Sequence, residues 1–287
     1  MTDAPDEGTT HRLALGEPFP DVTLGYREWG PADAARTVVG VHGLTRNAAD
    51  FAGLGTALAA RGARLLAVDV VGRGDSSWLA DPSAYAIPTY AGHLARWLQR
   101  LELDRVDWVG TSMGGLVGMA LAASERPPMA RLVLNDIGPF VPKSALEEIG
   151  AYLANELWFS SLAAVERHLR TIHAGFGPLT DAQWRRLART SVVPDGAGWR
   201  LHYDPAIRVP YEDLAADDID LWELYERIAV PTLVLHGADS PLLDRATCDA
   251  MAERGPRAEV RHFAGVGHAP SLLADDQIEA VATWLGL

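Results

Sequence analysis

The sequence predicts an α/β protein with an open, mostly parallel sheet, helices on both of its faces, and one inserted helical segment. Short apolar runs alternate with amphipathic stretches over most of the 287-residue chain. The runs are apolar at nearly every position, which is typical of parallel strands that are buried on both faces. The alternation stops between about residues 138 and 227, where the pattern becomes helical and rich in aromatic residues.

The predicted strands are the short apolar runs. Six of them are Val38–Val41, Leu65–Val68, Val106–Val109, Leu132–Leu134, Thr232–Leu235 and Glu259–His262. Two earlier runs, Arg12–Leu15 and Val22–Trp29, are expected to form an antiparallel hairpin at one edge of the sheet.

The amphipathic stretches predict the helices that cover the sheet. They are about Ala48–Arg61, Tyr90–Leu101, Gly114–Ala123, Arg245–Arg254 and Gln277–Trp284. The segment 138–227 shows no strand pattern and holds Trp158, Trp184, Trp199 and Trp222, and we interpret it as a helical cap over the strand ends. The alternative is an ordinary second helical lobe. The predicted domains are a core of residues 1–137 and 228–287 and a cap of residues 138–227.

Composition limits the classes of partner. The chain has 25 Lys and Arg against 38 Asp and Glu, a net charge of −13. Such a surface repels nucleic acid and anionic membranes, so we expect neither as a partner and expect a small-molecule substrate instead. The single Cys248 excludes an internal disulfide and fits a reducing compartment. No secretory signal or membrane-spanning run is recognisable, which predicts a cytoplasmic protein. The oligomeric state stays open.

The segment Gly110-Thr111-Ser112-Met113-Gly114 is the first functional signal. It lies where the strand Val106–Val109 ends and the next helix begins. A serine in such a tight turn is held exposed above the strand ends, and its neighbours two positions away must lack bulk, which explains both glycines. Because the pentapeptide alone is a frequent chance match, its meaning depends on partners elsewhere in the chain.

A serine hydroxyl needs a base within hydrogen-bond reach and a carboxylate that orients this base. His268, in the loop after the last predicted strand, lies at the same edge of the sheet as Ser112 and is expected to be the base. The oxyanion formed on attack needs backbone N–H donors. We expect one from Met113, directly after the serine, and one from Leu44, in the loop after Val38–Val41. His42 in that loop is expected to hydrogen-bond within the turn.

Together these segments resemble the α/β-hydrolase superfamily. The matching pieces occur in the family's order and are His42-Gly43, Asp69-Val70-Val71-Gly72-Arg73-Gly74-Asp75-Ser76, Gly110 to Gly115, Leu235-His236-Gly237 and Gly267-His268. The resemblance implies the α/β-hydrolase fold, with a mostly parallel eight-stranded sheet flanked by helices and a cap between strands six and seven. It also implies a Ser-Asp-His triad that needs no cofactor.

The triad acid is left open by the sequence. The family commonly carries Asp after strand seven in a Gly-x-x-Asp pattern, but here that position is Ser240 and Asp239 comes one residue early. Other members carry the acid after strand six, where this chain has Asp136 at the end of a predicted strand. We favour Asp136, with Asp239 as the alternative and Asp244 as a further one.

Candidate substrate-binding residues are Arg46, Trp158 and Tyr203. Arg46 follows the expected oxyanion donor closely, so it either holds a substrate carboxylate or forms a salt bridge, to the cap or to Asp50. The aromatic residues belong to the cap, whose aromatic side chains are expected to form its core and in part to line a pocket. No zinc or P-loop motif occurs, so neither a metal nor a cofactor is expected.

The sequence therefore predicts a hydrolase that uses Ser112, His268 and Asp136 to cleave an ester, lactone or amide bond of a small organic substrate through an acyl-enzyme. The resemblance is to capped esterases, enol-lactonases and hydrolases of carbon–carbon bonds. A carbon–carbon bond hydrolase or lyase on the same triad is the first alternative. A ligand receptor with an inactive triad is the second, since a fold does not fix a function.

Overall fold

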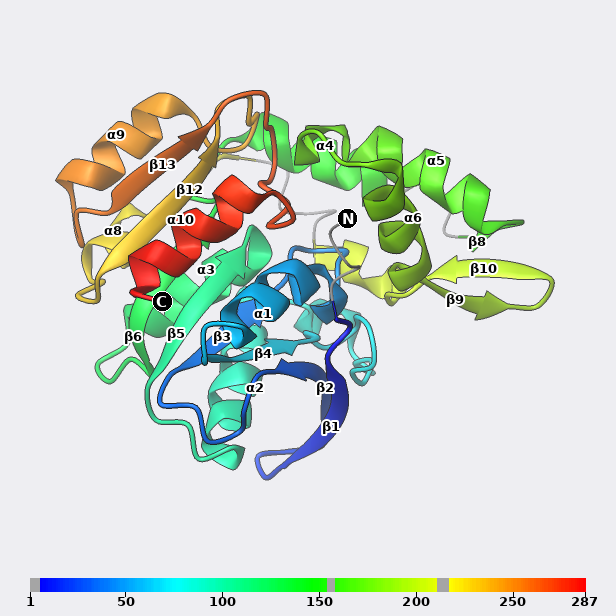
Figure 1. Cartoon of the computed structure of the whole chain (residues 1–287), viewed down its shortest axis with the longest axis horizontal. Helices are drawn as coiled ribbons and strands as arrows, with labels where there is room; N and C mark the ends of the chain where they lie inside the picture. Colours follow the sequence, from blue (N-terminus) through cyan, green and yellow to red (C-terminus); the bar gives the residue numbers. More distant parts are fainter. Residues whose placement is uncertain (1–5, 154–157, 211–216) are drawn as a thin grey trace.

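The computed structural model describes residues 6–153, 158–210 and 217–287. Its main feature is an eight-stranded sheet (Figure 1). The strands are β1 (Thr9–Gly16), β2 (Phe19–Trp29), β3 (Thr37–Val41), β4 (Arg64–Val68), β5 (Val106–Thr111), β6 (Met129–Asn135), β12 (Thr232–Gly237) and β13 (Glu259–Phe263). All eight were predicted, with ends displaced by a few residues.

The strand order across the sheet is β1-β2-β4-β3-β5-β6-β12-β13. Strands β1 and β2 pair antiparallel at one edge, β2 pairs antiparallel with β4, and the pairs from β4 to β13 are parallel. The predicted edge hairpin and the mostly parallel sheet are both confirmed. Since parallel strands end at one common edge, the loops after β3, β5, β6, β12 and β13 meet there.

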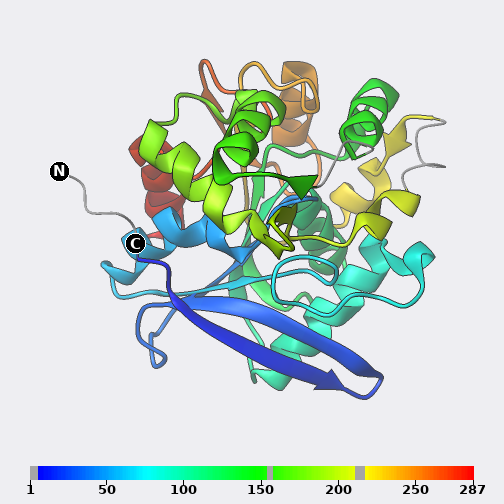
Figure 2. The same ribbon diagram turned by 90° about the vertical axis from the view of Figure 1, so that its right-hand side faces the viewer.

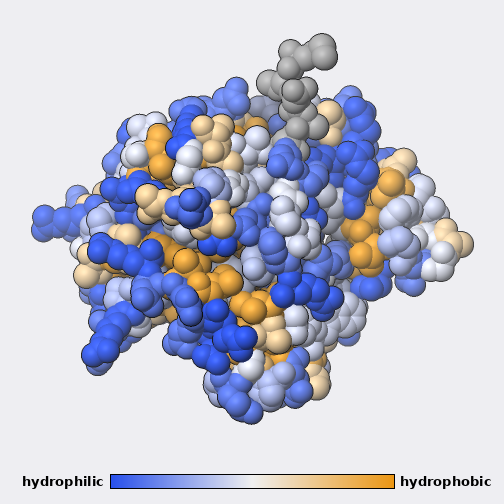
Figure 3. All heavy atoms as spheres, turned by 60° about the horizontal axis from the view of Figure 1, so that its bottom comes forward, coloured by the Kyte–Doolittle hydropathy of each residue, from blue (hydrophilic) through white to orange (hydrophobic). Residues whose placement is uncertain are grey.

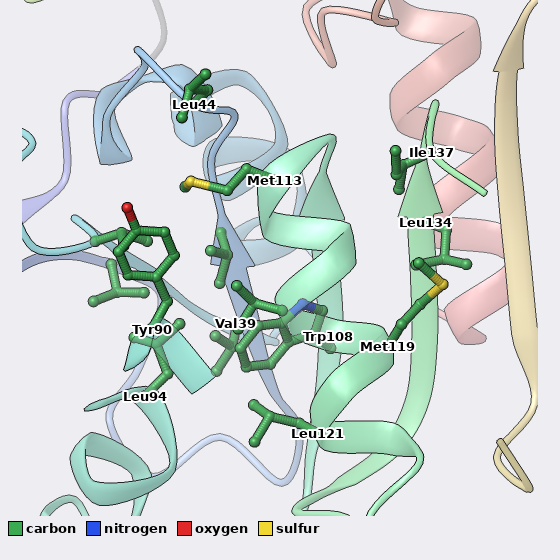
Figure 4. Packing of buried hydrophobic residues seen from close by; sticks show 14 of the residues in the cluster. Val39, Leu44, Tyr90, Leu94, Trp108, Met113, Met119, Leu121, Leu134 and Ile137 are labelled. Carbon is green, nitrogen blue, oxygen red and sulfur yellow. The ribbon is translucent and has the colours of Figure 1, made fainter. Parts of the chain in front are cut away.

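Helices cover both faces of the sheet. They are η1 (Ala48–Phe51), α1 (Ala52–Ala59), η2 (Pro82–Ala84), α2 (Ile87–Arg100), α3 (Met113–Ala122), α9 (Arg245–Glu253) and α10 (Asp275–Leu285). Successive strand residues point to opposite faces, so Val38 packs with α1 and α10 whereas Val39 packs with α2, α3 and α9. Two hydrophobic cores result, which is why the strands are apolar throughout. Figure 4 shows the second core, with Trp108 and Met119 between β5, β6 and α3.

The described part of segment 138–227, for which we keep the name cap, is not purely helical, and the prediction that it lacks strands is wrong. Its helices are α4 (Lys143–Leu153), α5 (Leu162–Ile172), η3 (Ala174–Phe176), α6 (Asp181–Thr190) and η4 (Pro205–Arg208). Strands β8 (Trp158–Phe159), β9 (Val192–Asp195) and β10 (Gly198–Leu201) form a small antiparallel sheet. These strands have two to four residues, too few for a periodic pattern to reveal.

The two ends of the cap meet at a short antiparallel pair. Strands β7 (Phe140–Val141) and β11 (Ile219–Asp220) pair just outside the main sheet. The following helix α8 (Trp222–Glu226) packs on α9, where the hydroxyl of Tyr225 donates to the carbonyl oxygen of Met251 at 2.9 Å. Figure 2 shows the cap helices on the opposite side of the molecule from the β1–β2 hairpin.

The face in Figure 3 is mainly hydrophilic, with apolar patches among the polar residues. None of the helices in the described ranges is both long and apolar enough to span a membrane.

Candidate active site

Ser112 stands in a strained turn between β5 and α3. Its backbone angles are φ 51° and ψ −114°, which residues with a side chain rarely adopt. A Cβ on Gly110 would lie 2.3 Å from the carbonyl oxygen of Gly114, and a Cβ on Gly114 would lie 2.1 Å from that of Val41. Both glycines are therefore required, and the serine lies at the carboxyl edge of the sheet, where the sequence predicts it.

His268 faces Ser112 from the loop after β13, with its Nε2 2.9 Å from the serine Oγ. The cap holds this loop, because the N–H of Gly267 donates to the carbonyl oxygen of Gly175 in η3 at 2.7 Å. A Cβ on Gly175 would lie 3.0 Å from the backbone nitrogen of His268. The sequence analysis missed this glycine, since nothing in the sequence relates it to the His268 loop.

Asp136 accepts hydrogen bonds from three segments. Its Oδ2 accepts from Nδ1 of His268 at 2.7 Å and from the hydroxyl of Ser240 at 2.6 Å, and its Oδ1 accepts from the N–H of Gly237 at 2.8 Å. The residue is fully buried and has a φ of 57°. A carboxylate at Nδ1 selects the neutral tautomer with its lone pair on Nε2, which is the form that accepts a proton from a serine.

The other candidate acids lie elsewhere. Asp239 is exposed, and its N–H donates to the carbonyl oxygen of Val266. Asp244 precedes α9 and accepts from the N–H of Thr247 at 2.7 Å, as a helix-capping residue does. The structure thus brings Asp136 to His268 and leaves both alternatives outside this arrangement. Ser240, at the position where the family commonly has Asp, binds the carboxylate instead of replacing it.

His42 organises the loop after β3. Its Nε2 accepts from the N–H of Val70 at 3.0 Å, so its Nδ1 carries the proton that is donated to the carbonyl oxygen of Gly43 at 2.7 Å. Burial lowers the pKa of His42 to about 3. The ring is therefore neutral at pH 7 and shapes the turn, as expected. In this turn the N–H of Arg46 donates to the carbonyl oxygen of Gly43, so Leu44 lies at its second position.

Leu44 and Met113 lie on either side of a buried arginine. Arg73 is fully buried; its Nε donates to the carbonyl oxygen of Leu44 at 2.8 Å, and its Nη2 lies 3.6 Å from the sulfur of Met113. Its guanidinium also donates to the hydroxyl of Tyr90 and the carbonyl oxygen of Val71. Within the described ranges it forms no ion pair. Figure 4 shows Leu44, Met113 and Tyr90, which come from three different segments of the core. As the first residue of α3, Met113 has an N–H without an intrahelical acceptor.

Two cavities lie between the cap and the loops of the core. The first is lined by Thr111 and Ala269, which are the sequence neighbours of Ser112 and His268, and by Phe176 and Leu187 of the cap. The second, which we call the cap-side cavity, is lined by Tyr203 among others. Arg46 lies in the walls of both.

The predicted substrate-binding residues have different positions. Arg46 is buried and forms a two-contact ion pair with Asp50 at 2.6 and 2.8 Å, and its Nη1 donates to Ser191 at 2.7 Å. Tyr203 is buried in the wall of the cap-side cavity. Trp158, by contrast, is 41% exposed on β8 and lines neither cavity, so we no longer assign it to substrate binding.

No group of three or more His, Cys, Asp or Glu side chains in the described part of the chain is arranged to hold a metal ion.

The fold and the site together define an α/β protein in which a serine contacts a histidine, and this histidine contacts an aspartate, at the carboxyl edge of the sheet. The sequence model of the alpha/beta hydrolase fold family matches residues 36–275. The chain belongs to this family of hydrolases, and the predicted fold class is confirmed.

Individual relatives are similar over nearly their whole length. A 3-hydroxybutyrate-oligomer hydrolase of Cupriavidus necator is 42% identical over 264 residues, covering 89% of this chain and 90% of the relative. Among solved structures, a hydrolase of Rickettsia typhi has a TM-score of 0.90 and 31% identity, covering 97% of this chain and 99% of that one. An alpha/beta hydrolase of Novosphingobium aromaticivorans has a TM-score of 0.87 and 32% identity, with 99% of both chains covered.

Proposed function

We propose that this protein is a serine esterase that hydrolyses short linear oligoesters of a small hydroxy acid, 3-hydroxybutyrate being the first candidate. The observation that carries the chemistry is the contact series Ser112 Oγ, His268 Nε2, His268 Nδ1 and Asp136 Oδ2, at 2.9 and 2.7 Å. The substrate class comes from the similarity to the Cupriavidus necator hydrolase over nine-tenths of both chains.

In the first half of the reaction, Ser112 Oγ bonds to the ester carbonyl carbon while its proton passes to Nε2 of His268. The buried carboxylate of Asp136 stabilises the imidazolium. The carbonyl electron pair moves to the oxygen, which the N–H groups of Leu44 and Met113 stabilise. The carbon–oxygen bond to the leaving hydroxy acid then breaks, and its oxygen takes the proton from His268.

In the second half, water gives a proton to His268 and bonds to the acyl carbon of Ser112. The bond to Oγ breaks, and the serine regains its proton from the imidazolium. The net reaction consumes one ester and one water and yields one acid and one alcohol. Each step is a proton or acyl transfer between the groups named here and the substrate.

The test is incubation with the linear trimer of 3-hydroxybutyrate, with products followed by liquid chromatography and mass spectrometry. Dimer and monomer are expected from the parent protein, and Ser112→Ala should be slower by about 10⁴-fold or more. A fluorophosphonate should add once, at Ser112. If Ser112→Ala matches the parent rate, the mechanism is wrong. If the adduct forms at Ser112 but the trimer is not hydrolysed, the proposal of an activated serine is supported and the proposed substrate class is wrong.

A further inference from the structure

The cap-side cavity begins one residue beyond the expected oxyanion donor Leu44. Its walls come from the loop after β3 and from cap helices α4 and α5 with the segments after α6 and β10; its inner part has room for about one water molecule, and the rest is open to solvent. Its polar lining consists of Thr45, Arg46, Tyr152, His168, His173 and Tyr203, together with Ser191. The mechanism proposed above uses none of these side chains.

The charge on this lining has one sign. Among its described residues are one guanidinium and no carboxylate, and burial lowers the pKa of both imidazoles, so that they are neutral at pH 7. Asp50, which pairs with Arg46, lines the other cavity. The charged groups that act on the hydroxyl of Tyr152 are Arg46 and Arg73, both cationic. An anion placed beside Tyr152 therefore meets an attractive potential.

His173 supplies an unused hydrogen-bonding atom in this cavity. Its Nε2 is buried and has no hydrogen-bond partner within the described ranges. The ring is stacked on Phe176, with centroids 4.4 Å apart and planes at 14°, which fixes its orientation. Burial and the positive groups around it hold the pKa of His173 well below its usual value. A buried polar atom without a partner is unfavourable in the free protein and gains a hydrogen bond when a polar ligand arrives.

The hydroxyls of the cavity are loosely paired as well. Those of Thr45 and Tyr152 lie 3.4 Å apart, which is long for a bond between two oxygens. The nearby Arg46 has donors left, since Asp50 and Ser191 take three of its five N–H groups. A carboxylate accepts several hydrogen bonds and carries the charge that this lining attracts.

We propose that the cap-side cavity binds the free carboxylate at the end of the substrate, so that the enzyme removes hydroxy-acid units from the carboxyl end of an oligoester. This inference rests on the proposed esterase function. The scissile ester lies at Ser112, and the leaving hydroxy acid extends past Leu44 and Thr45 with its carboxylate near His173 and Tyr152. An oligomer capped as a methyl ester offers the same internal ester bonds without the charge, and cleavage of its added methyl ester is distinguished by the release of methanol.

The test compares the linear dimer of 3-hydroxybutyrate as free acid and as methyl ester. For the parent protein, kcat/KM is expected to be about tenfold higher with the free acid than with the methyl ester, because one charge-assisted hydrogen bond contributes an effect of about this size. His173→Phe keeps a ring on Phe176 but removes Nε2, and Tyr152→Phe removes the hydroxyl. Each should bring the ratio of the two substrates close to one through a higher KM for the free acid. The two variants differ in their risk to folding, and circular dichroism checks both.

His11→Phe is the matched control, because His11 also stacks on an aromatic ring, that of Tyr26, but on the edge hairpin. It should leave the ratio unchanged. Equal kcat/KM of the parent for both substrates would overturn the inference and leave the esterase proposal intact. If folded parent protein hydrolyses neither dimer, the esterase proposal fails instead. In that case calorimetry measures the affinity of the cavity for 3-hydroxybutyrate directly, in the Ser112→Ala protein with and without His173→Phe. If His173→Phe does not weaken this binding, the inference is overturned.

Discussion

The hydroxyl of Ser240 lies 2.6 Å from Oδ2 of Asp136, the same carboxylate oxygen that accepts from Nδ1 of His268. The N–H groups of Leu242 and Leu243 both point at the Ser240 oxygen, at 3.2 Å. They orient this hydroxyl so that its proton faces the carboxylate. The loop after β12 therefore holds the acid that comes from the end of β6.

Replacement of Ser240 by Ala should lower kcat about tenfold, because the buried carboxylate loses one charge-assisted hydrogen bond and can rotate away from His268. KM should change little, since Ser240 lies behind the triad. Ser240→Thr keeps a hydroxyl and should recover most of the rate. Steady-state kinetics of both variants check this, and an Ala variant as fast as the Thr variant would show that the contact has no kinetic role.

Asp136→Asn should reduce kcat by about 10³- to 10⁴-fold, because an amide can no longer stabilise the imidazolium or select the tautomer of His268. Asp239→Asn, one residue before Ser240 but exposed, is its control and should keep parent activity. The rate of fluorophosphonate labelling at Ser112 measures both variants without a natural substrate. The opposite pattern would assign the acid to Asp239.

Arg73→Met should lower kcat about tenfold with little change in the KM of an uncharged ester, because a buried cation behind Leu44 and Met113 stabilises the oxyanion more than the neutral ester carbonyl. Arg73→Lys keeps the charge and should lose less. Tyr90→Phe removes one hydrogen-bond partner of the guanidinium but keeps its charge, so its effect on kcat measures how much the position of Arg73 matters. A folded Met variant with parent kcat would contradict the electrostatic role, and thermal melting shows whether each variant is folded.

Gly175→Ala should reduce kcat by about tenfold, since the new methyl group would press on the backbone nitrogen of His268 and displace the imidazole. Gly150→Ala is the control within the cap, because a Cβ there meets no atom of another described segment within 4 Å. Comparing the two by steady-state kinetics separates a local contact from a general effect of alanine in the cap. Equal kcat values for the two variants would mean that the His268 loop accommodates the methyl group without affecting catalysis.

Stability should fall below pH 6.5 in a way that depends on His42. The unfolded chain binds a proton at His42 near pH 6.5, whereas the native state does so only near pH 3, so the contribution of the neutral ring is present above pH 6.5 and is lost as the pH falls. The loss reaches about 2 kcal/mol at pH 5. Urea unfolding of the parent and of His42→Asn at pH 8 and pH 5 tests this. The stability difference between them should shrink at pH 5, and a constant difference would rule out the assignment.

The sheet and the position of the serine are predictable because they depend on local signals. Buried strands such as β3 and β12 are continuous apolar runs, and the turn at Ser112 needs glycines at fixed offsets. The choice between Asp136 and Asp239 depends on how the loop after β12 folds back, and two carboxylates at neighbouring strand ends look equivalent in the sequence. The short cap strands and the contact of Gly175 with the His268 loop arise from tertiary packing. Neither hydrophobic periodicity nor motif spacing predicts such packing.

Asp136 is the first residue after β6, and the chain leaves for the cap directly after it. Ser112, Asp136 and His268 all lie outside residues 138–227, and two hydrogen bonds between described residues join the cap to the His268 loop: the N–H of Gly267 donates to the carbonyl oxygen of Gly175, and the side-chain amide of Gln183 donates to that of Leu273. During evolution, the sequence of the inserted segment can therefore change without any substitution at Ser112, Asp136 or His268. A transplanted cap has to join at the β7–β11 neck, supply a carbonyl oxygen where Gly175 now stands, and replace polar contacts with the core such as that of Ser191 with Arg46.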